Sequence, residues 1–217
     1  MIEVKSIRTA DNGGTILIDV LLTSDGGSEK EERSLLLLPE QYRELKIRRG
    51  LITREQFDAA EEASVLCQAV RRGRYLLSFG ANSSSALCLK LRRKGFSADV
   101  SAAAVGIIQS EGAIDEGRDA VRQAELRVRH GEGRQRILYN LRSKGYGADA
   151  MAKAEKYLDG VDFTSLCRKV IEKKYGSLPD ARDGRQKCIA ALLRLGFTFG
   201  QIRGAGLDAD VPDDTEI

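Results

Sequence analysis

The 217-residue sequence has no tryptophan, and only 6% of its residues are aromatic. A hydrophobic core built from such a sequence must be aliphatic and rich in alanine, which suits closely packed helices better than a β-sandwich. No apolar run approaches the ~20 residues that a membrane-spanning helix needs. Charged residues occur throughout residues 1–20, so a signal peptide is not expected there. We therefore expect a cytoplasmic protein without membrane contact.

Residues that would support catalysis or metal binding are equally scarce. The single histidine, His130, stands at an expected helix end, where interaction with the helix dipole explains it better than catalysis. Phosphate-binding loops and Gly-x-Ser-x-Gly motifs are absent from the sequence. The cysteines form no Cys-x-x-Cys pair and stand in apolar sequence, which indicates buried free thiols rather than a zinc site. They are Cys67, Cys88, Cys167 and Cys188. We expect a non-enzymatic protein with no cofactor and no metal.

Charge is distributed unevenly along the chain, although the net charge is only +3. Residues 1–64 hold 9 Lys and Arg against 13 Asp and Glu, residues 65–206 hold 26 against 14, and residues 207–217 hold none against 5. A strongly basic body between acidic ends favours a polyanionic partner, such as nucleic acid or an acidic protein surface. An ordinary solvated helical surface is the alternative interpretation of this pattern.

A short motif recurs in the second half of the chain. Residues 91–99 read LRRKGFSAD and residues 141–149 read LRSKGYGAD, identical at six of nine positions, and residues 192–197 (LLRLGF) are a weaker third copy. A constant period of about 50 residues indicates stacked supersecondary units. Each glycine is expected just past a helix end, with a Schellman contact between the leucine and the aromatic residue. These capping residues are Leu91, Gly95, Phe96, Leu141, Gly145, Tyr146, Leu192, Gly196 and Phe197.

The repeated motif predicts a mainly α-helical, elongated fold of tandem three-helix repeats. We expect repeat 1 over residues 53–112, repeat 2 over residues 113–160 and repeat 3 over residues 161–206. Thr53 and Gln56 have the spacing of a capping box that opens the first, long helix. Gly-, Ser-, Asn- and Asp-containing segments are expected as breaks between helices. These breaks are residues 80–84, 112–115, 131–133, 159–162 and 177–184.

The two ends of the chain differ from the repeats. β-Branched and aliphatic residues at 2–7 and 15–22 flank Asn12-Gly13-Gly14, which is typical of a β-hairpin. A third strand at residues 33–38 and a short helix from Pro39 would follow. Residues 1–52 therefore predict a small β-containing segment. Residues 207–217 are acidic and are expected to be a disordered tail.

The repeats resemble the RecX family, the small regulatory proteins of the recombinase RecA, over roughly residues 60–204. Residues 71–96 are similar to that family's first repeat, residues 133–146 to its second-repeat signature and residues 184–197 to its closing repeat. Residues 112–116 resemble the family's acidic turn between repeats one and two. The chain departs from the pattern at Asp119, which replaces an aromatic residue, and residues 1–50 show no specific resemblance.

The resemblance implies a modulator of RecA, usually an inhibitor, that acts in homologous recombination, DNA repair and the SOS response. Such a protein lies along the groove of the RecA–DNA filament, where it reduces ATP hydrolysis and strand exchange. We expect a monomer whose partner is the RecA filament, and direct contact with single- or double-stranded DNA stays open. The alternatives are a stand-alone nucleic-acid-binding protein with helix-turn-helix-like units and an adaptor that uses the repeats as a scaffold.

Basic side chains are the candidate binding residues. Those at helix ends are also explained by the helix dipole, but capping cannot account for all of them. Arginine can in addition form bidentate contacts with carboxylates. The candidates for contact with RecA or nucleic acid are Arg71, Arg72, Arg74, Arg92, Arg93, Lys94, Arg134, Arg136, Arg142, Lys144, Arg168, Lys169, Lys173, Lys174, Arg185 and Lys187.

Overall fold

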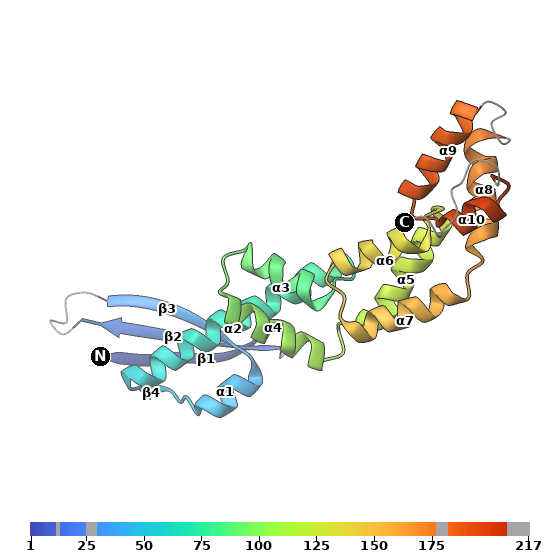
Figure 1. Ribbon diagram of the computed structural model, residues 1–217. Helices are drawn as coiled ribbons and strands as arrows, with labels where there is room; N and C mark the ends of the chain where they lie inside the picture. The colour runs from blue at the N-terminus through green and yellow to red at the C-terminus, as the bar shows by residue number, and fades with distance from the viewer. Residues whose placement is uncertain (12–13, 25–29, 177–181, 208–217) are drawn as a thin grey trace. The chain divides into compact units, whose positions relative to one another are not determined.

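The structure is a computed structural model that describes residues 1–11, 14–24, 30–176 and 182–207. Its residues form two compact units, unit 1 with residues 1–81 and 87–113 and unit 2 with residues 82–86 and those from 114 onward. The predicted fold class, mainly helical with a small N-terminal sheet, is confirmed (Figure 1). None of the helices in these described ranges has the length and apolar character needed to cross a membrane.

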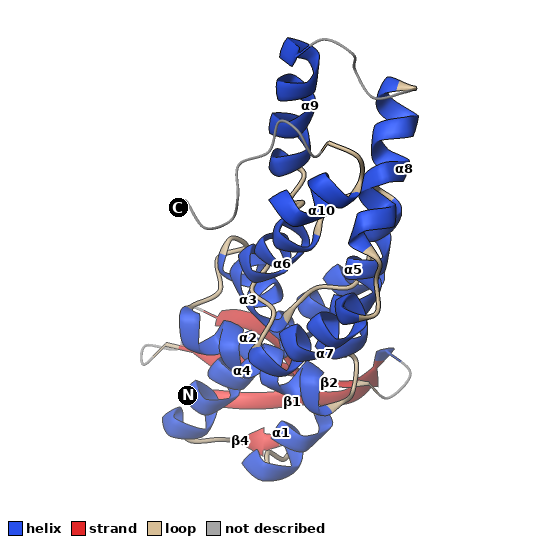
Figure 2. Ribbon diagram, turned by 45° about the vertical axis from the view of Figure 1, so that its right-hand side comes forward, coloured by secondary structure: helices blue, strands red, loops and turns tan. Residues whose placement is uncertain are grey.

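Unit 1 begins with a four-stranded antiparallel sheet in the order β3-β2-β1-β4. Its strands are β1 (Ile2–Ala10), β2 (Thr15–Thr23), β3 (Lys30–Leu37) and β4 (Gly50–Leu51). The first two strands pair as the predicted hairpin, with Ala10 opposite Thr15. Figure 2 shows the strands, in red, as one layer with helices beside it.

The sheet buries one apolar face, because alternate side chains of a strand point to the same side. Val4, Ile18 and Leu35 belong to this face and are buried. Phe57, from the first turns of α2 (Arg54–Ser78), packs into the same core and is 2% exposed. Burial of such an aromatic side chain stabilises the fold by about 1.5–3 kcal/mol. The N-terminal sheet and α2 therefore share one core.

Helix α2 begins at the predicted capping box. Thr53 Oγ1 accepts a hydrogen bond from the Gln56 amide, and the Thr53 amide donates to Gln56 Oε1, both at 3.1 Å. The helix runs for 25 residues, and its later part packs against α4 (Ala98–Ser110). The short α1 (Pro39–Leu45) precedes it, and α3 (Ser84–Arg92) lies between α2 and α4 in the chain.

Unit 2 consists of six described helices after its segment 82–86. They are α5 (Glu116–Arg129), α6 (Arg134–Ser143), α7 (Ala148–Asp159), α8 (Phe163–Tyr175), α9 (Arg182–Arg194) and α10 (Phe199–Gly204). Helices α5, α6 and α7 pack on one another, and α10 packs on α8 and α9. One aliphatic, alanine-containing core runs through all six helices, in line with the scarcity of aromatic residues in the sequence.

Glycines with a positive φ follow α3, α6 and α9. The angle is 97° at Gly95, 75° at Gly145 and 90° at Gly196, a conformation that glycine adopts without the steric cost of a Cβ. The Phe96 amide donates to the Leu91 carbonyl oxygen at 3.4 Å, which is the Schellman hydrogen bond. The corresponding bond after α9 joins the Phe197 amide to the Leu192 carbonyl at 3.2 Å, and the Gly145 amide donates to the Arg142 carbonyl at 2.9 Å.

The break that we expected at residues 177–184 is wrong in its second part. Helix α9 already begins at Arg182, and residues 177–181 lie outside the described residues. Asp183 in the first turn interacts favourably with the positive end of the helix dipole, and a glycine inside a helix costs only about 1 kcal/mol. Gly184 is therefore accommodated within the helix. Leu207, where we expected the acidic tail to begin, is 2% exposed in the core of unit 2, and residues 208–217 are not described.

Candidate functional site

Two of the candidate cations in unit 1 form ion pairs with nearby acids. Arg71 Nη2 lies 3.1 Å from Asp11 Oδ2. Arg74 Nη2 lies 2.5 Å from Glu111 Oε1, and its Nε donates to the other carboxylate oxygen at 3.2 Å. These pairs are partly exposed and contribute little stability, but they compensate the positive charge at short range.

The remaining candidates of unit 1 have other surroundings. The Arg72 guanidinium lies over the ring of Tyr75, 5.0 Å from its centre, as in a cation–π contact. Arg92, Arg93 and Lys94 are exposed at the end of α3. The helix dipole favours cations at this end of a helix. That interaction is the simplest explanation for the three basic residues at the end of α3.

The candidates of α6 are mostly engaged inside unit 2. Arg134 Nη2 pairs with Asp159 at 2.8 Å, and Arg142 Nη2 lies 3.5 Å from Glu155. Lys144 Nζ donates to Gln123 Oε1 at 2.7 Å. Burial lowers the pKa of Lys144, and the nearby positive charge of Arg127 acts in the same direction.

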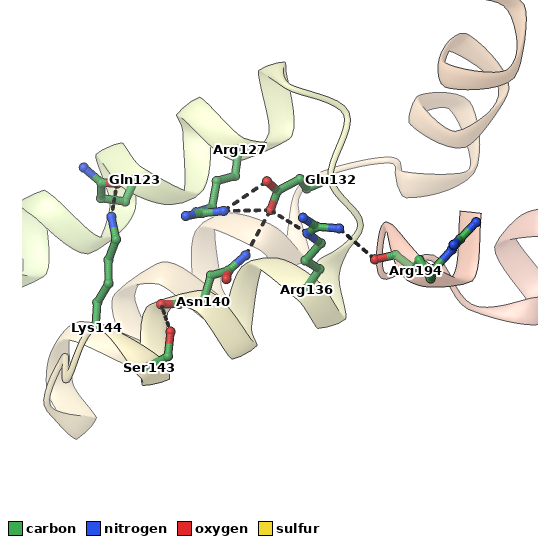
Figure 3. A network of polar contacts seen from close by, with 8 residues as sticks. All are labelled: Gln123, Arg127, Glu132, Arg136, Asn140, Ser143, Lys144 and Arg194. Atoms are coloured by element: carbon green, nitrogen blue, oxygen red, sulfur yellow. Dashed lines mark hydrogen bonds and ion pairs between the residues drawn. The ribbon is translucent and has the colours of Figure 1, made fainter. Parts of the chain in front are cut away.

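Glu132 is the centre of a polar network between α5 and α6 (Figure 3). Arg127 Nη1 donates to both of its carboxylate oxygens, at 3.0 and 2.9 Å, and Asn140 Nδ2 donates to one of them at 3.2 Å. Arg136 Nε lies 3.7 Å from the same carboxylate, and its Nη1 donates to the Arg194 carbonyl oxygen at 2.9 Å. Arg136 therefore links the start of α6 to the end of α9, a structural role.

The start of α6 and the end of α9 are also joined through their backbones. The Gly133 amide donates to the Leu195 carbonyl oxygen at 2.7 Å, and the Gln135 amide donates to the Gly196 carbonyl oxygen at 3.3 Å. Amides in the first turn of a helix and carbonyls in the last turn have no partner within their own helix. Each helix end thus satisfies the other, and the opposite ends of two helix dipoles meet.

A second joint of unit 2 holds the segment that leads into α3. Ser83 Oγ donates to the Lys144 carbonyl oxygen at 2.6 Å. The Glu116 carboxylate accepts hydrogen bonds from two backbone amides, Ser84 at 2.5 Å and Gly147 at 3.4 Å. Glu116, the first residue of α5, therefore ties together the starts of α3 and α7.

Asp119, the departure from the family pattern, is buried and paired with Tyr146. The Tyr146 hydroxyl donates a hydrogen bond to its carboxylate, and Asp119 is 8% exposed. Burial raises the pKa of Tyr146, and the hydrogen bond to Asp119 raises it further. The equivalent aromatic residues, Phe96 and Phe197, have no hydroxyl. A tyrosine in the second motif therefore accompanies a carboxylate at the position where the family has an aromatic residue.

A groove of about 490 Å³ in unit 2 collects basic side chains over an apolar floor. We call it the basic groove. Its floor is formed by Leu166, Val170 and Leu195, and no Asp or Glu is present among the described residues that line it. Its basic residues are Arg129, His130, Lys169, Lys173 and Lys174. This composition suits a ligand that carries both negative charge and apolar groups.

Local structure explains the position of each basic side chain. Lys173 and Lys174 lie in the last turn of α8, where the helix dipole favours cations, and Lys169 stands one turn before Lys173. Arg129 ends α5, and His130 caps it, with the His130 amide donating to the Leu126 carbonyl at 3.1 Å. The expected helix-end position of His130 is confirmed, but the same residue also lines the basic groove.

Sequence reasoning identified only part of the basic groove. Lys169, Lys173 and Lys174 were among the candidates, whereas Arg129 was missed and His130 was assigned only to the helix end. Arg129 and His130 end α5, about 40 residues earlier in the chain, and Gly131 approaches Val170 closely where the two segments meet. Of the other candidates, Arg168 donates to the Gly204 carbonyl at 3.0 Å, and Arg185 and Lys187 lie on α9.

The cysteines and the possible metal ligands are further candidate functional groups. All four cysteines are free, with Cys67, Cys167 and Cys188 buried and Cys88 half-buried. Burial raises the pKa of Cys67 and of Cys167 to about 11, so both thiols stay protonated at neutral pH. In the part of the chain that the structure describes, no three His, Cys, Asp or Glu side chains are placed to hold a metal ion.

Comparisons with known proteins agree on one family. Residues 162–205 match the family model described as RecX, third three-helix domain. The chain is 32% identical over 155 residues to the regulatory protein RecX of Halorhodospira halophila, covering 70% of this chain and 96% of that protein. It is 31% identical over 148 residues to the regulatory protein RecX of Chlorobaculum tepidum, covering 67% of this chain and 88% of that protein.

Solved structures show the same fold. A crystal structure of regulatory protein RecX matches with a TM-score of 0.71 at 18% identity, over 94% of this chain and 99% of that chain. The crystal structure of RecX from Lactobacillus salivarius matches with a TM-score of 0.57 at 19% identity, over 68% of this chain and 98% of that chain. With the sequence identity to its relatives and the match of its last three helices, this chain belongs to the RecX family of regulatory proteins.

Proposed function

We propose that this protein is a non-enzymatic inhibitor of RecA, acting as a monomer in the cytoplasm. It binds in the groove of the RecA–DNA filament and reduces ATP hydrolysis and strand exchange. The observation that carries this proposal is the basic groove, in which Arg129, Lys169, Lys173 and Lys174 lack an acidic neighbour among the described lining residues. The regulatory name of its relatives supports the same role.

The distribution of compensated and uncompensated charge supports the basic groove as the contact surface. Arg71, Arg74, Arg134 and Arg142 each lie beside a carboxylate of this chain, so they contribute less to the field outside the molecule. Cations without such a neighbour attract an acidic surface over a distance and raise the rate of association, an effect that salt weakens. The apolar floor of the basic groove then adds short-range contacts.

A filament is also a suitable partner for a chain of successive helical groups. Several weak contacts on neighbouring protomers reinforce one another, because each contact raises the effective concentration of the next. We therefore propose that each unit contributes a contact of its own to the filament, the basic groove in unit 2 and the exposed cations of α3 in unit 1.

The test is the ATPase activity of RecA on single-stranded DNA with equimolar protein. We expect inhibition by the unmodified chain and at least tenfold weaker inhibition by Lys169→Glu/Lys173→Glu. Arg48→Glu/Arg49→Glu is the matched control, because it makes the same change of charge at exposed residues outside the basic groove. If the unmodified chain leaves the ATPase activity of RecA unchanged, the proposal is wrong. If Lys169→Glu/Lys173→Glu inhibits RecA as strongly as the unmodified chain, the basic groove is not the surface that contacts RecA.

Direct nucleic-acid binding is the second candidate function. It is favoured by the exposed Arg92, Arg93 and Lys94 at the end of α3, which phosphate groups could approach. It predicts saturable binding to an oligonucleotide without RecA, with affinity that falls steeply as salt rises. The absence of saturable binding at moderate salt would exclude this function.

A further inference from the structure

The basic groove needs an anionic and partly apolar occupant. Four full cations and His130 surround Leu166, Val170 and Leu195. The cations repel one another, and the apolar floor stays in contact with water as long as nothing covers it. Both effects are relieved when an acidic segment with apolar side chains lies in the groove.

We propose that the chain's own acidic segment, residues 208–217, occupies the basic groove and competes there with the external partner. This segment lies outside the described residues. The inference rests on the proposed function in one respect, that the basic groove is where the partner binds. The occupant itself follows from charge, sequence pattern and reach.

The charges of the two parts are complementary. Residues 208–217 contain five acidic residues and no lysine or arginine. The described lining of the basic groove contains Arg129 and three lysines and no acidic residue. In the rest of unit 2, acidic side chains such as Asp159 and Glu155 are paired with arginines of α6. The acidic segment is therefore a close electrostatic match for the groove.

The order of residues in the segment suits a groove with a basic rim and an apolar floor. In an extended chain, alternate side chains point to the same side. Asp208, Asp210, Asp214 and Glu216 would then share one side, and Val211, Asp213 and Ile217 would stand on the other. Such a strand can direct four of its five carboxylates toward lysines while Val211 and Ile217 cover the floor.

The segment starts close enough to reach the groove. Leu207, the residue before the segment, is buried, and the end of α10 is held on α8 by the hydrogen bond from Arg168 Nη2 to the Gly204 carbonyl at 3.0 Å. Helix α8, with 13 residues, is about 20 Å long. Ten extended residues span about 33 Å. Ten residues are therefore long enough to reach Lys169 and Lys173 from the end of α10.

Tethering makes this contact effective even if it is weak. A segment joined to its site by a short flexible connection has an effective concentration in the millimolar range. An external acidic partner at micromolar concentration must displace it. The acidic segment would thus raise the concentration of partner that is needed and favour partners that make additional contacts elsewhere.

The experiment measures binding of a fluorescein-labelled peptide with the sequence of residues 207–217 by fluorescence anisotropy. The proteins are the full chain and a variant with a neutral segment, Asp208→Asn, Asp210→Asn, Asp213→Asn, Asp214→Asn and Glu216→Gln. These positions follow Leu207, the last described residue of the core of unit 2. We expect the neutral variant to bind the peptide at least tenfold more tightly than the full chain, because its groove is vacant.

Two further variants tie the effect to the groove. Adding Lys169→Glu/Lys173→Glu to the neutral variant should abolish peptide binding, and adding Arg48→Glu/Arg49→Glu should leave it unchanged. Equal affinity of the full chain and the neutral variant would show that the groove is open to external peptides, which overturns the inference. Absence of saturable binding to the neutral variant would overturn it as well.

The RecA ATPase assay with the same proteins separates this inference from the proposed function. Tighter peptide binding by the neutral variant supports the inference even when RecA activity does not respond to any of the proteins. Inhibition of RecA without any peptide binding supports the proposed function and refutes the inference. If both hold, the neutral variant should inhibit RecA at a lower concentration than the full chain.

Discussion

The joint between α6 and α9 gives a sharp prediction for Gly133→Ala. A Cβ on Gly133 would lie 2.3 Å from both the carbonyl carbon and oxygen of Gly196 and 2.5 Å from the Phe197 amide nitrogen. All three are backbone atoms, so no rotation of a side chain can relieve the overlap. The joint must open, and the hydrogen bonds from the Gly133 and Gln135 amides are then lengthened or lost.

The expected destabilisation is about 2–4 kcal/mol. Overpacking of a close contact costs about 1–3 kcal/mol, and a backbone hydrogen bond contributes about 1 kcal/mol. The local backbone does not oppose alanine, because Gly133 has φ −77° and ψ 161°, which any residue adopts. Alanine would even gain about 0.4–1 kcal/mol from the smaller entropy of its unfolded chain. The decrease in the free energy of unfolding therefore reports the cost of disrupting the backbone contact between Gly133 and Gly196.

Gly147→Ala is the matched control. Gly147 is also the N-cap of a helix, with φ −71° and ψ 169°, but a Cβ there would meet nothing closer than Glu116 Oε2 at 3.5 Å. We expect its stability to stay within about 0.5 kcal/mol of the unmodified chain. Urea unfolding followed by circular dichroism measures both variants, and hydrogen exchange at the ends of α6 and α9 reports the joint locally. If Gly133→Ala is as stable as Gly147→Ala, the backbone joint is not a stabilising contact.

Further predictions concern buried and capping groups of unit 2. Tyr146→Phe should destabilise the fold by about 1–3 kcal/mol in urea unfolding, because the Asp119 carboxylate loses its donor, and Asp119→Leu/Tyr146→Phe should recover part of that loss. Because the folded state raises the pKa of Tyr146, its contribution is complete below the ordinary value of 10.0 and is lost as pH rises above it. The stability difference between the unmodified chain and Tyr146→Phe should therefore change above pH 10 and stay constant between pH 6 and 9. Asp162→Ala should cost about 1 kcal/mol, because Asp162 caps α8 by accepting from the Ser165 amide at 2.9 Å, and unchanged stability would contradict the cap.

Local signals explain which parts of the fold were predictable from sequence. The capping box at Thr53 and the hairpin around residues 12–14 depend on neighbouring residues, and the structure has the expected helix start and strand pairing there. The glycine of each repeated motif likewise marks a helix end through its own backbone preference. The start of α9 was harder, because Gly184 suggested a break while Asp183 allowed the helix to begin earlier.

The candidate site was less predictable, because it depends on distant pairs. Sequence alone does not show that Arg74 meets Glu111, 37 residues away, and so loses much of its effect outside the molecule. Nor does it show that Arg129 comes beside Lys169, since this requires the close approach of Gly131, just after α5, to Val170 of α8. The basic character of the chain was visible from composition, whereas the selection of the uncompensated cations required the fold.

The α6–α9 joint also bears on how such arrays are lengthened. Gly133-Arg134-Gln135 and Gly184-Arg185-Gln186 are identical triplets, yet the first stands at the very start of its helix and the second lies inside α9. The Gly133 and Gln135 amides of the first triplet donate to carbonyls that follow α9. To attach a further helical module in the same way, a designer would have to make α9 begin at Gly184, so that the second triplet stands at the start of its helix. Copying the triplet sequence alone would not create the joint.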